Sequence, residues 1–220
     1  MNKHLLALAS LILVSSASAD DIYGGLGVPG IATVGYTKHL SQAWNVRVEL
    51  SGGTDWKERG NYEGVEADLR VKSNRVGVYG DWFPFEAAPF RLVGGLTVND
   101  TRAKLNATGR GTVTIGDAVN VDLGQDFYRV KLEQPSITPY LGLGYGHRST
   151  SLPGLGFYAD IGLMAGTMKV SSETSLVGKL DGTGRAITQA DVDQQSRKIR
   201  DSVARLKALP VASVGLTYRF

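Results

Sequence analysis

Residues 209–220, LPVASVGLTYRF, alternate between two kinds of side chain down to the final aromatic residue. A period of two predicts a β-strand whose two faces meet different surroundings. Such a strand suits the surface of a soluble sandwich, and it equally suits a membrane strand with lipid outside and a polar lumen inside. The large apolar groups share one face, at Ala212, Val214, Leu216, Tyr218 and Phe220.

Residues 1–19 have the layout of a secretory signal peptide. Lys3 precedes an apolar stretch at 5–14, and an Ala-Ser-Ala sequence ends at Ala19, so we expect cleavage near Ala19 and an exported domain at 20–220. No later stretch has the roughly 20 apolar residues that a membrane helix needs. A membrane location would therefore require a closed β-barrel, since the edge of an open sheet leaves backbone groups unpaired in lipid.

Composition excludes several classes of protein. Hydrophobic residues make up 42% of the chain and charged residues 20%, which argues against disorder, and a net charge of +3 does not predict nucleic-acid binding. The absence of cysteine excludes thiol catalysis and cysteine metal sites. After the signal peptide only His39 and His147 remain, too few for a dedicated metal site, so we expect neither metal nor cofactor.

Period-two segments recur along the chain and alternate with short and long connections. Aromatic residues gather beside the short connections, as in the girdle of a membrane barrel, which favours a barrel over a sandwich. We therefore predict an all-β, eight-stranded antiparallel up-and-down transmembrane β-barrel, with short periplasmic turns and long extracellular loops. The expected strands are 22–28, 30–40, 44–53, 65–83, 90–107, 127–147, 156–172 and 210–220, and the girdle is Trp44, Trp82, Phe90, Tyr145, Phe157 and Phe220.

In four of these strands the chemistry of the two faces is exchanged toward the long loops. Charged residues then face outward and apolar residues face inward, although the alternation with a period of two continues without a break. These strands are about twice the length that a bilayer needs. We therefore expect the four of them to rise beyond the membrane as a half-cylinder, which the strand at 44–53 is too short to join. A possible ligand-binding vestibule would be lined by Leu69, Val71, Leu105, Val130, Leu132, Met168 and Val170.

The last long loop, 173–209, contains a predicted amphipathic helix that could cover this apolar face. Thr188 is a good N-cap, with Asp191 three residues later, and Pro210 would end the helix. Its apolar stripe consists of Val192, Ile199, Val203 and Leu206.

Inward-facing charges should meet in the membrane section, where an eight-stranded barrel is filled by side chains. We interpret them as a structural plug of paired charges, with a proton or ion path as the alternative. The expected network is Arg47, Glu49, Asp81, Arg91, Asp160 and Arg219. Outward cations just above the lipid band would face lipopolysaccharide phosphates or simply solvent: Arg70, Lys72, Arg102, Lys104, Arg129, Lys131 and Lys169.

A His-x-Ser pair at His147 and Ser149, with Asp160 as a conceivable acid, resembles that of outer-membrane lipid A deacylases. Those enzymes act at the outer leaflet, whereas this pair lies beside a predicted periplasmic turn. We therefore predict no enzyme activity and keep a lipid A-modifying hydrolase as a remote alternative.

Four stretches, LTYRF, GYTKHLSQAWNV, DWFPF…FRLVGGLTVND and TPYLGLGYG, resemble the small OmpW-like or OmpX-like outer-membrane β-barrel proteins of Gram-negative bacteria. The resemblance covers nearly all of 20–220 and implies the fold and the outer membrane. It also implies that the barrel-assembly machinery reads Phe220 as an assembly signal. OmpW-like proteins are proposed to pass small apolar molecules through a hydrophobic interior, whereas the membrane section of this sequence is lined with charge.

The expected role is therefore a structural or envelope-surface one without catalysis, and the alternative is a narrow channel or carrier for small hydrophobic molecules. The expected partners are outer-membrane lipid, lipopolysaccharide and the assembly machinery, with a small hydrophobic ligand under the alternative. We expect a monomer that binds no nucleic acid.

Overall fold

The first and last strands of the structure pair with each other. In the computed structural model, which describes residues 20–62, 64–85, 88–148, 153–204 and 207–220, β1 (Asp21–Val28) runs antiparallel to β12 (Ala208–Arg219), with Asp21 opposite Arg219. The signal peptide predicted for 1–19 lies outside the described residues.

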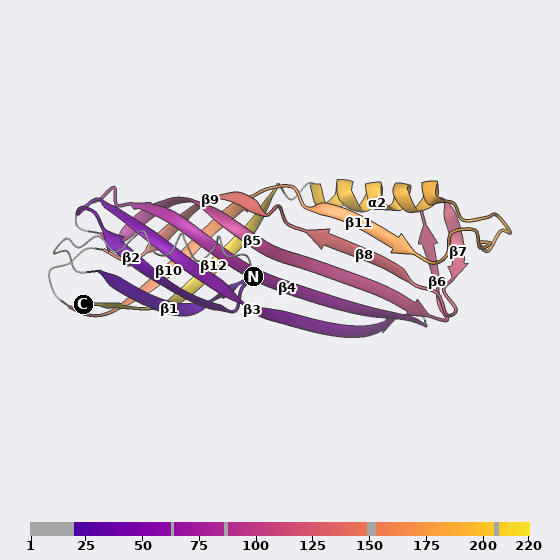
Figure 1. The fold of residues 1–220 in the computed structure, drawn as a ribbon, viewed down its shortest axis with the longest axis horizontal. Coiled ribbons are helices and arrows are strands. Elements are labelled where there is room, and N and C mark those ends of the chain that lie inside the picture. The colour runs from indigo at the N-terminus through magenta and orange to yellow at the C-terminus, as the bar shows by residue number, and fades with distance from the viewer. Residues whose placement is uncertain (1–19, 63, 86–87, 149–152, 205–206) are drawn as a thin grey trace, which may run out of the picture.

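Antiparallel pairing continues from strand to strand and returns to β12 (Figure 1). The succession from β1 runs through β2, β3, β4, β5, β9 and β10 to β12, because β5 pairs with β9 as well as with β4. The further strands of this path are β2 (Ala32–His39), β3 (Trp44–Tyr62), β4 (Val65–Trp82), β5 (Phe90–Gly109), β9 (Ile137–Tyr145) and β10 (Gly154–Ala165).

The ring is uneven, because β3, β4 and β5 continue far beyond the strands that complete it. Alongside β5 the chain adds β8 (Tyr128–Glu133) and then β11 (Lys169–Thr174). The resulting sheet, ordered β3-β4-β5-β8-β11, projects from one end of the ring (Figure 1), and we call it the extension. The described residues thus form an antiparallel all-β structure of twelve strands with one helix, in place of eight uninterrupted strands.

The extension has five strands, whereas four were predicted. The prediction that the strand at 44–53 ends below the extension is wrong. β3 continues to Tyr62, through residues that the expected strands 44–53 and 65–83 leave as a connection. A bulge lies between Ser51 and Thr54, where Gly53 has a φ of +86°. Beyond the bulge Asp55, Lys57 and Arg59 alternate with only one large apolar residue, Trp56, so the sequence lacks the contrast that marks a half-buried strand.

Two of the predicted long strands are each divided into two. The strand predicted at 127–147 is interrupted at 134–136, where Pro135 has no N–H to donate. The strand predicted at 156–172 is interrupted at 166–168, with Gly166 at a φ of +157°. The predicted loop 108–126 contains a separate hairpin of β6 (Thr112–Ile115) and β7 (Ala118–Asp122).

The inner face of the extension packs against helix α2 (Gln189–Ala204), the β6–β7 hairpin and the segment between β11 and the helix. Val192 of the helix is 2% exposed and Ile199 packs against the same cluster. Among the described residues no helix is long and apolar enough to cross a membrane. The buried members of this cluster are Ala107, Ile115, Ala118, Val121, Leu123, Tyr128, Val130, Val170, Leu176, Ile187 and Val192.

Helix α2 begins with a reciprocal cap. Thr188 donates its backbone N–H to Asp191 over 2.8 Å, and the Asp191 N–H donates to the Thr188 hydroxyl over 3.3 Å. The Arg185 guanidinium, with the Thr188 donors, holds the pKa of Asp191 well below its usual range. The helix is described as far as Ala204 and β12 begins at Ala208, so Pro210, which was predicted to end the helix, lies inside β12.

The seam between β1 and β12 provides the first prediction. A Cβ on Gly215 would collide with the Gly24 carbonyl oxygen and lie 2.6 Å from Gly25 Cα, and backbone atoms in a paired strand cannot move away. We expect Gly215→Ala to destabilise the fold by about 1–3 kcal/mol through overpacking, measured by urea unfolding of the refolded protein in micelles.

Gly94→Ala is the matched control, since nothing lies within 4 Å of a Cβ at that position in β5. Equal unfolding midpoints for the two variants would contradict close packing at the seam.

Candidate functional site

A buried network of charges crosses the interior of the ring. Inward positions of β3, β4, β5 and β10 bring Arg47, Asp81, Arg91 and Asp160 together. Arg47 Nε lies 2.7 Å from Asp81 Oδ2, and Arg91 Nη2 lies 2.6 Å from Asp160 Oδ1. The crossed pairs are longer, at 3.3 Å for Arg47–Asp160 and 3.4 Å for Arg91–Asp81. Each guanidinium therefore faces both carboxylates.

Glu49 extends this network toward the extension through a residue outside the predicted set. Arg75 Nη2 donates to Glu49 Oε1 over 2.9 Å, and the Tyr23 hydroxyl donates to Glu49 Oε2 over 3.2 Å. Arg75 shares the inward face of β4 with Asp81, so strand parity alone would have found it. Three arginines then face three carboxylates, and the network is formally neutral.

Aromatic rings surround the network and leave little room around it. The Arg47 guanidinium carbon lies 5.2 Å from the centre of the Tyr79 ring and 5.7 Å from that of Tyr23. Arg47 and Arg91 are 2% and 0% exposed. Because both guanidinium side chains are almost fully buried among carboxylates, with Arg47 also against two aromatic rings, this level of the ring is a filled section.

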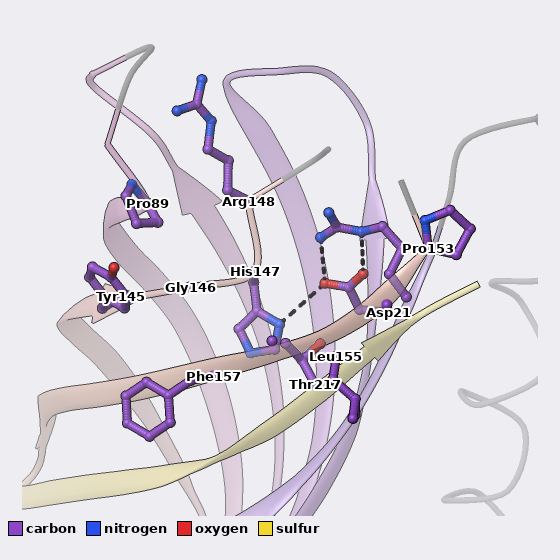
Figure 2. Close-up of a pocket in the computed structure, with 13 residues that line it drawn as sticks. Asp21, Pro89, Tyr145, Gly146, His147, Arg148, Pro153, Leu155, Phe157 and Thr217 are labelled. Atoms are coloured by element: carbon purple, nitrogen blue, oxygen red, sulfur yellow. Dashed lines mark hydrogen bonds and ion pairs between the residues drawn. The ribbon is translucent and has the colours of Figure 1, made fainter. Parts of the chain in front are cut away.

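Arg219 does not join the other five predicted network residues. Its Nε donates to Asp21 Oδ1 over 2.7 Å, at the end of the ring away from the extension. His39 Nε2 lies 3.2 Å and His147 Nδ1 3.6 Å from the same carboxylate. Figure 2 shows Asp21 linked to His147. One predicted network is therefore two separate clusters.

The second cluster forms the floor of a pocket of about 410 Å³. Asp21 and His147 are buried, whereas Tyr145, Leu155 and Phe157 lie at its more exposed rim. Among the residues that the structure describes, no group of His, Asp and Glu is arranged to hold a metal ion.

Among the described residues, His147 and Asp160, which were considered for a deacylase, do not pair with each other. Asp160 pairs with two arginines, while His147 Nδ1 lies 3.3 Å from the Thr37 hydroxyl and close to Asp21. Ser149 lies outside the described residues. The carboxylate nearest to His147 is thus Asp21, which sequence reasoning did not consider.

The seven predicted vestibule residues divide into covered and uncovered groups. Val130, Leu132 and Val170 belong to the cluster under helix α2, while Met168 lies in the break before β11. Leu69 and Val71 are half-buried, and Leu105 is 40% exposed. Of the helix stripe, Val203 is half-buried and Leu206 lies outside the described residues. The helix thus covers the β8–β11 side of the face more completely than the β4 side.

The charge network provides a second prediction. Arg91→Met should destabilise the protein by about 3–5 kcal/mol, because Asp160 and Asp81 would share the single guanidinium of Arg47 in a buried site. Adding Asp160→Asn should recover part of this loss, as measured by free energies of unfolding in urea.

Arg59→Met is the control, since its ion pair with Asp68 involves an arginine side chain that is 79% exposed. Its expected effect is below about 1 kcal/mol. If Arg91→Met proved as mild, the internal pairs would not hold the ring together.

Comparison with known proteins gives a likeness of fold. No protein-family model matches the chain, and no curated protein does. The crystal structure of Acinetobacter baumannii CarO2 matches with a TM-score of 0.63 at 18% identity, covering 94% of this chain and 100% of that one. The crystal structure of A. baumannii CarO gives 0.60 at 18% identity, over 91% and 97%. The chain therefore shares the antiparallel β fold of the CarO structures over nearly its whole length.

Proposed function

We propose that this chain is an integral outer-membrane β-barrel protein with a structural, envelope-surface role and no catalysis. Its eight mutually paired strands, β1 to β5, β9, β10 and β12, would cross the bilayer. The likeness to the CarO structures supports a barrel of this general kind and leaves the OmpW-like or OmpX-like assignment a prediction from the sequence.

The outside of the ring supports a membrane location. Large apolar side chains point outward around it, with Leu26 63%, Leu96 60% and Leu141 72% exposed. A continuous apolar belt of this kind is rare on soluble monomers and is what a lipid-facing barrel wall requires. At the short-turn end Trp44 stacks on Trp82 with ring centres 6.3 Å apart, and Phe220 is 56% exposed, as expected for an interfacial girdle.

The filled section at Arg47 and Arg91 is the observation that carries the structural role. A neutral network with almost no exposed surface offers no path for an apolar molecule along the axis. Helix α2 adds a second obstruction, because Val192 is buried against the inner face of the extension. With the short turns in the periplasm, the extension and its helix would stand on the cell surface.

One observation favours a carrier for small hydrophobic molecules as the second candidate. Trp56 lies opposite Val71 on the inner face and is 54% exposed, and Leu105 nearby is 40% exposed. The pairing of β3 with β2 ends at Gly52, so the upper part of β3 is an edge beside this apolar surface. A molecule could leave sideways there without passing the charge network. A lipid A-modifying hydrolase has less support, since Asp160 is engaged by arginines.

Solute uptake separates the two candidates. Liposomes containing the refolded protein should take up a slowly permeating apolar solute no faster than protein-free liposomes. Val192→Asp with Ile199→Asp should release the helix, because each places a charge in the apolar cluster. Under the structural role this variant also leaves uptake unchanged, as recorded by solute fluorescence.

Faster uptake by the wild type, or by the helix variant alone, would instead support the carrier. Arg197→Ala with Arg200→Ala on the exposed face of the helix controls for a general effect of altering it.

Phe220 provides a test of membrane assembly. If the assembly machinery reads this residue, its deletion should lower the amount of folded protein in the outer-membrane fraction severalfold. Phe157→Ala removes a comparably exposed girdle aromatic, at 53%, and should have a much smaller effect. Equal yields for both variants, with equal refolding in micelles, would argue against an assembly signal.

A further inference from the structure

Four cations lie directly opposite one another on the outer face of the extension. The strand register places Lys57 opposite Arg70, Arg70 opposite Lys104, and Lys104 opposite Lys131, across β3, β4, β5 and β8. Their inward neighbours are Leu69, Leu105 and Val130 among others, so all four side chains point outward. We call Lys57, Arg70, Lys104 and Lys131 the cationic ladder.

This arrangement is unfavourable within the protein alone, because like charges directly opposite each other destabilise a sheet. Arg70 is compensated by Asp55, which accepts two hydrogen bonds of 2.8 Å from its guanidinium, and Lys131 by Glu133 at 2.7 Å. Lys104, between them, has no ion-pair partner among the described residues. The middle of the ladder therefore keeps uncompensated positive charge.

A surface pocket coincides with this excess charge. Arg70, Lys72, Arg102 and Lys104 line a hollow of about 230 Å³ on β4 and β5. Two acids lie beside it: Asp55 pairs with Arg70, and Asp100 pairs with Arg102 and lies 4.0 Å from Lys72, which leaves Lys104 free to bind an anion. Guanidinium and ammonium groups converging on one hollow are suited to phosphate oxygens.

The height of the ladder fits a lipid head group. On the outward face of β4 and β5 the last apolar pair is Val76 and Val98, followed by Asn74 and Asp100 and then by Lys72 and Arg102. With a rise of about 3.3 Å per residue and a tilt of about 45°, the ladder lies on the order of 10–15 Å above Val76. Long basic side chains can reach down from there toward the interface.

We propose that the cationic ladder and its pocket bind the phosphate groups of lipopolysaccharide in the outer leaflet. The choice of lipid rests on the proposed outer-membrane location, and the choice of phosphate rests on the ladder itself. A phosphorylated glycolipid beside β4 and β5 supplies both the negative charge that the ladder lacks and acyl chains for the apolar surface beneath it.

The test uses the whole exported chain, refolded in detergent micelles and titrated with bisphosphorylated lipid A, with binding followed by native mass spectrometry. The variant Lys57→Gln/Lys104→Gln/Lys131→Gln leaves the Arg70–Asp55 pair intact. We expect it to bind lipid A about tenfold more weakly, since three exposed charge pairs together contribute about that factor. Arg110→Gln/Arg197→Gln/Arg200→Gln makes the same change in net charge at exposed positions elsewhere and should bind as the wild type does.

A second readout guards against misfolding of the triple variant. The variant also breaks the Lys131–Glu133 pair, but such an exposed pair contributes little. Because like charges that face each other are removed, its unfolding temperature without lipid should be equal to or above that of the wild type. The protection given by added lipid A should nevertheless fall. Loss of stability in the absence of lipid would overturn the argument that the ladder needs an external anion.

Three further outcomes would overturn the proposal. Equal binding of dephosphorylated lipid A would exclude phosphate recognition, and equal binding of phosphatidylglycerol would exclude this lipid as the specific occupant. Displacement of lipid A by inorganic phosphate at equal concentration would indicate a site for the free ion. The assay requires no membrane crossing, so its failure would leave the uptake and fractionation results standing.

Discussion

One edge of β5 determines the whole architecture, because two different strands share it. Its lower part pairs with β9, from Phe90 to Val98, and its upper part with β8, from Arg102 to Ala107. Between them the Asn99 N–H donates to the Ser136 carbonyl and the Gln134 N–H to the Thr101 carbonyl, so hydrogen bonding continues across the break. β9 leads into the closed ring, while β8 leads out to β11 and the extension. The closing of the ring and the projection of the extension thus both depend on this edge of β5, whose backbone groups must stay paired along its whole length.

The ring and the extension have opposite arrangements of polar and apolar side chains, and the change from one to the other occurs at one level along the strands. In the ring the charges are inside and neutralise one another, which allows an apolar exterior. In the extension the apolar residues are inside under helix α2, and charges cover the exterior. The level of Ser73 and Arg75 marks the change, since Arg75 still pairs inward with Glu49 whereas Val71, on the same face, meets apolar neighbours.

Alternation predicted the strands wherever the two faces differed in polarity, as in 214–220 and 90–98. It failed in the upper part of β3, where charges alternate with few apolar residues. Alternation also could not reveal the breaks at 134–136 and 166–168. The strand residues on either side of each break are four positions apart, an even number, so the same residues face inward and outward as in an unbroken strand. The interior charges followed from parity, but their division into two clusters did not, because it depends on the stagger of the strands. Arg219 meets Asp21 because β12 is registered against β1.

The pairing of β1 with β12 has a consequence for the order of folding. Asp21 and Arg219 are separated by 198 positions along the chain, yet they are hydrogen-bonded neighbours across the seam. Loop closure over such a separation is entropically costly and slow. The β3–β4 hairpin, in contrast, joins residues that are almost adjacent, at Tyr62 and Val65. We therefore expect local hairpins, including those of the extension, to form early and the seam to close last.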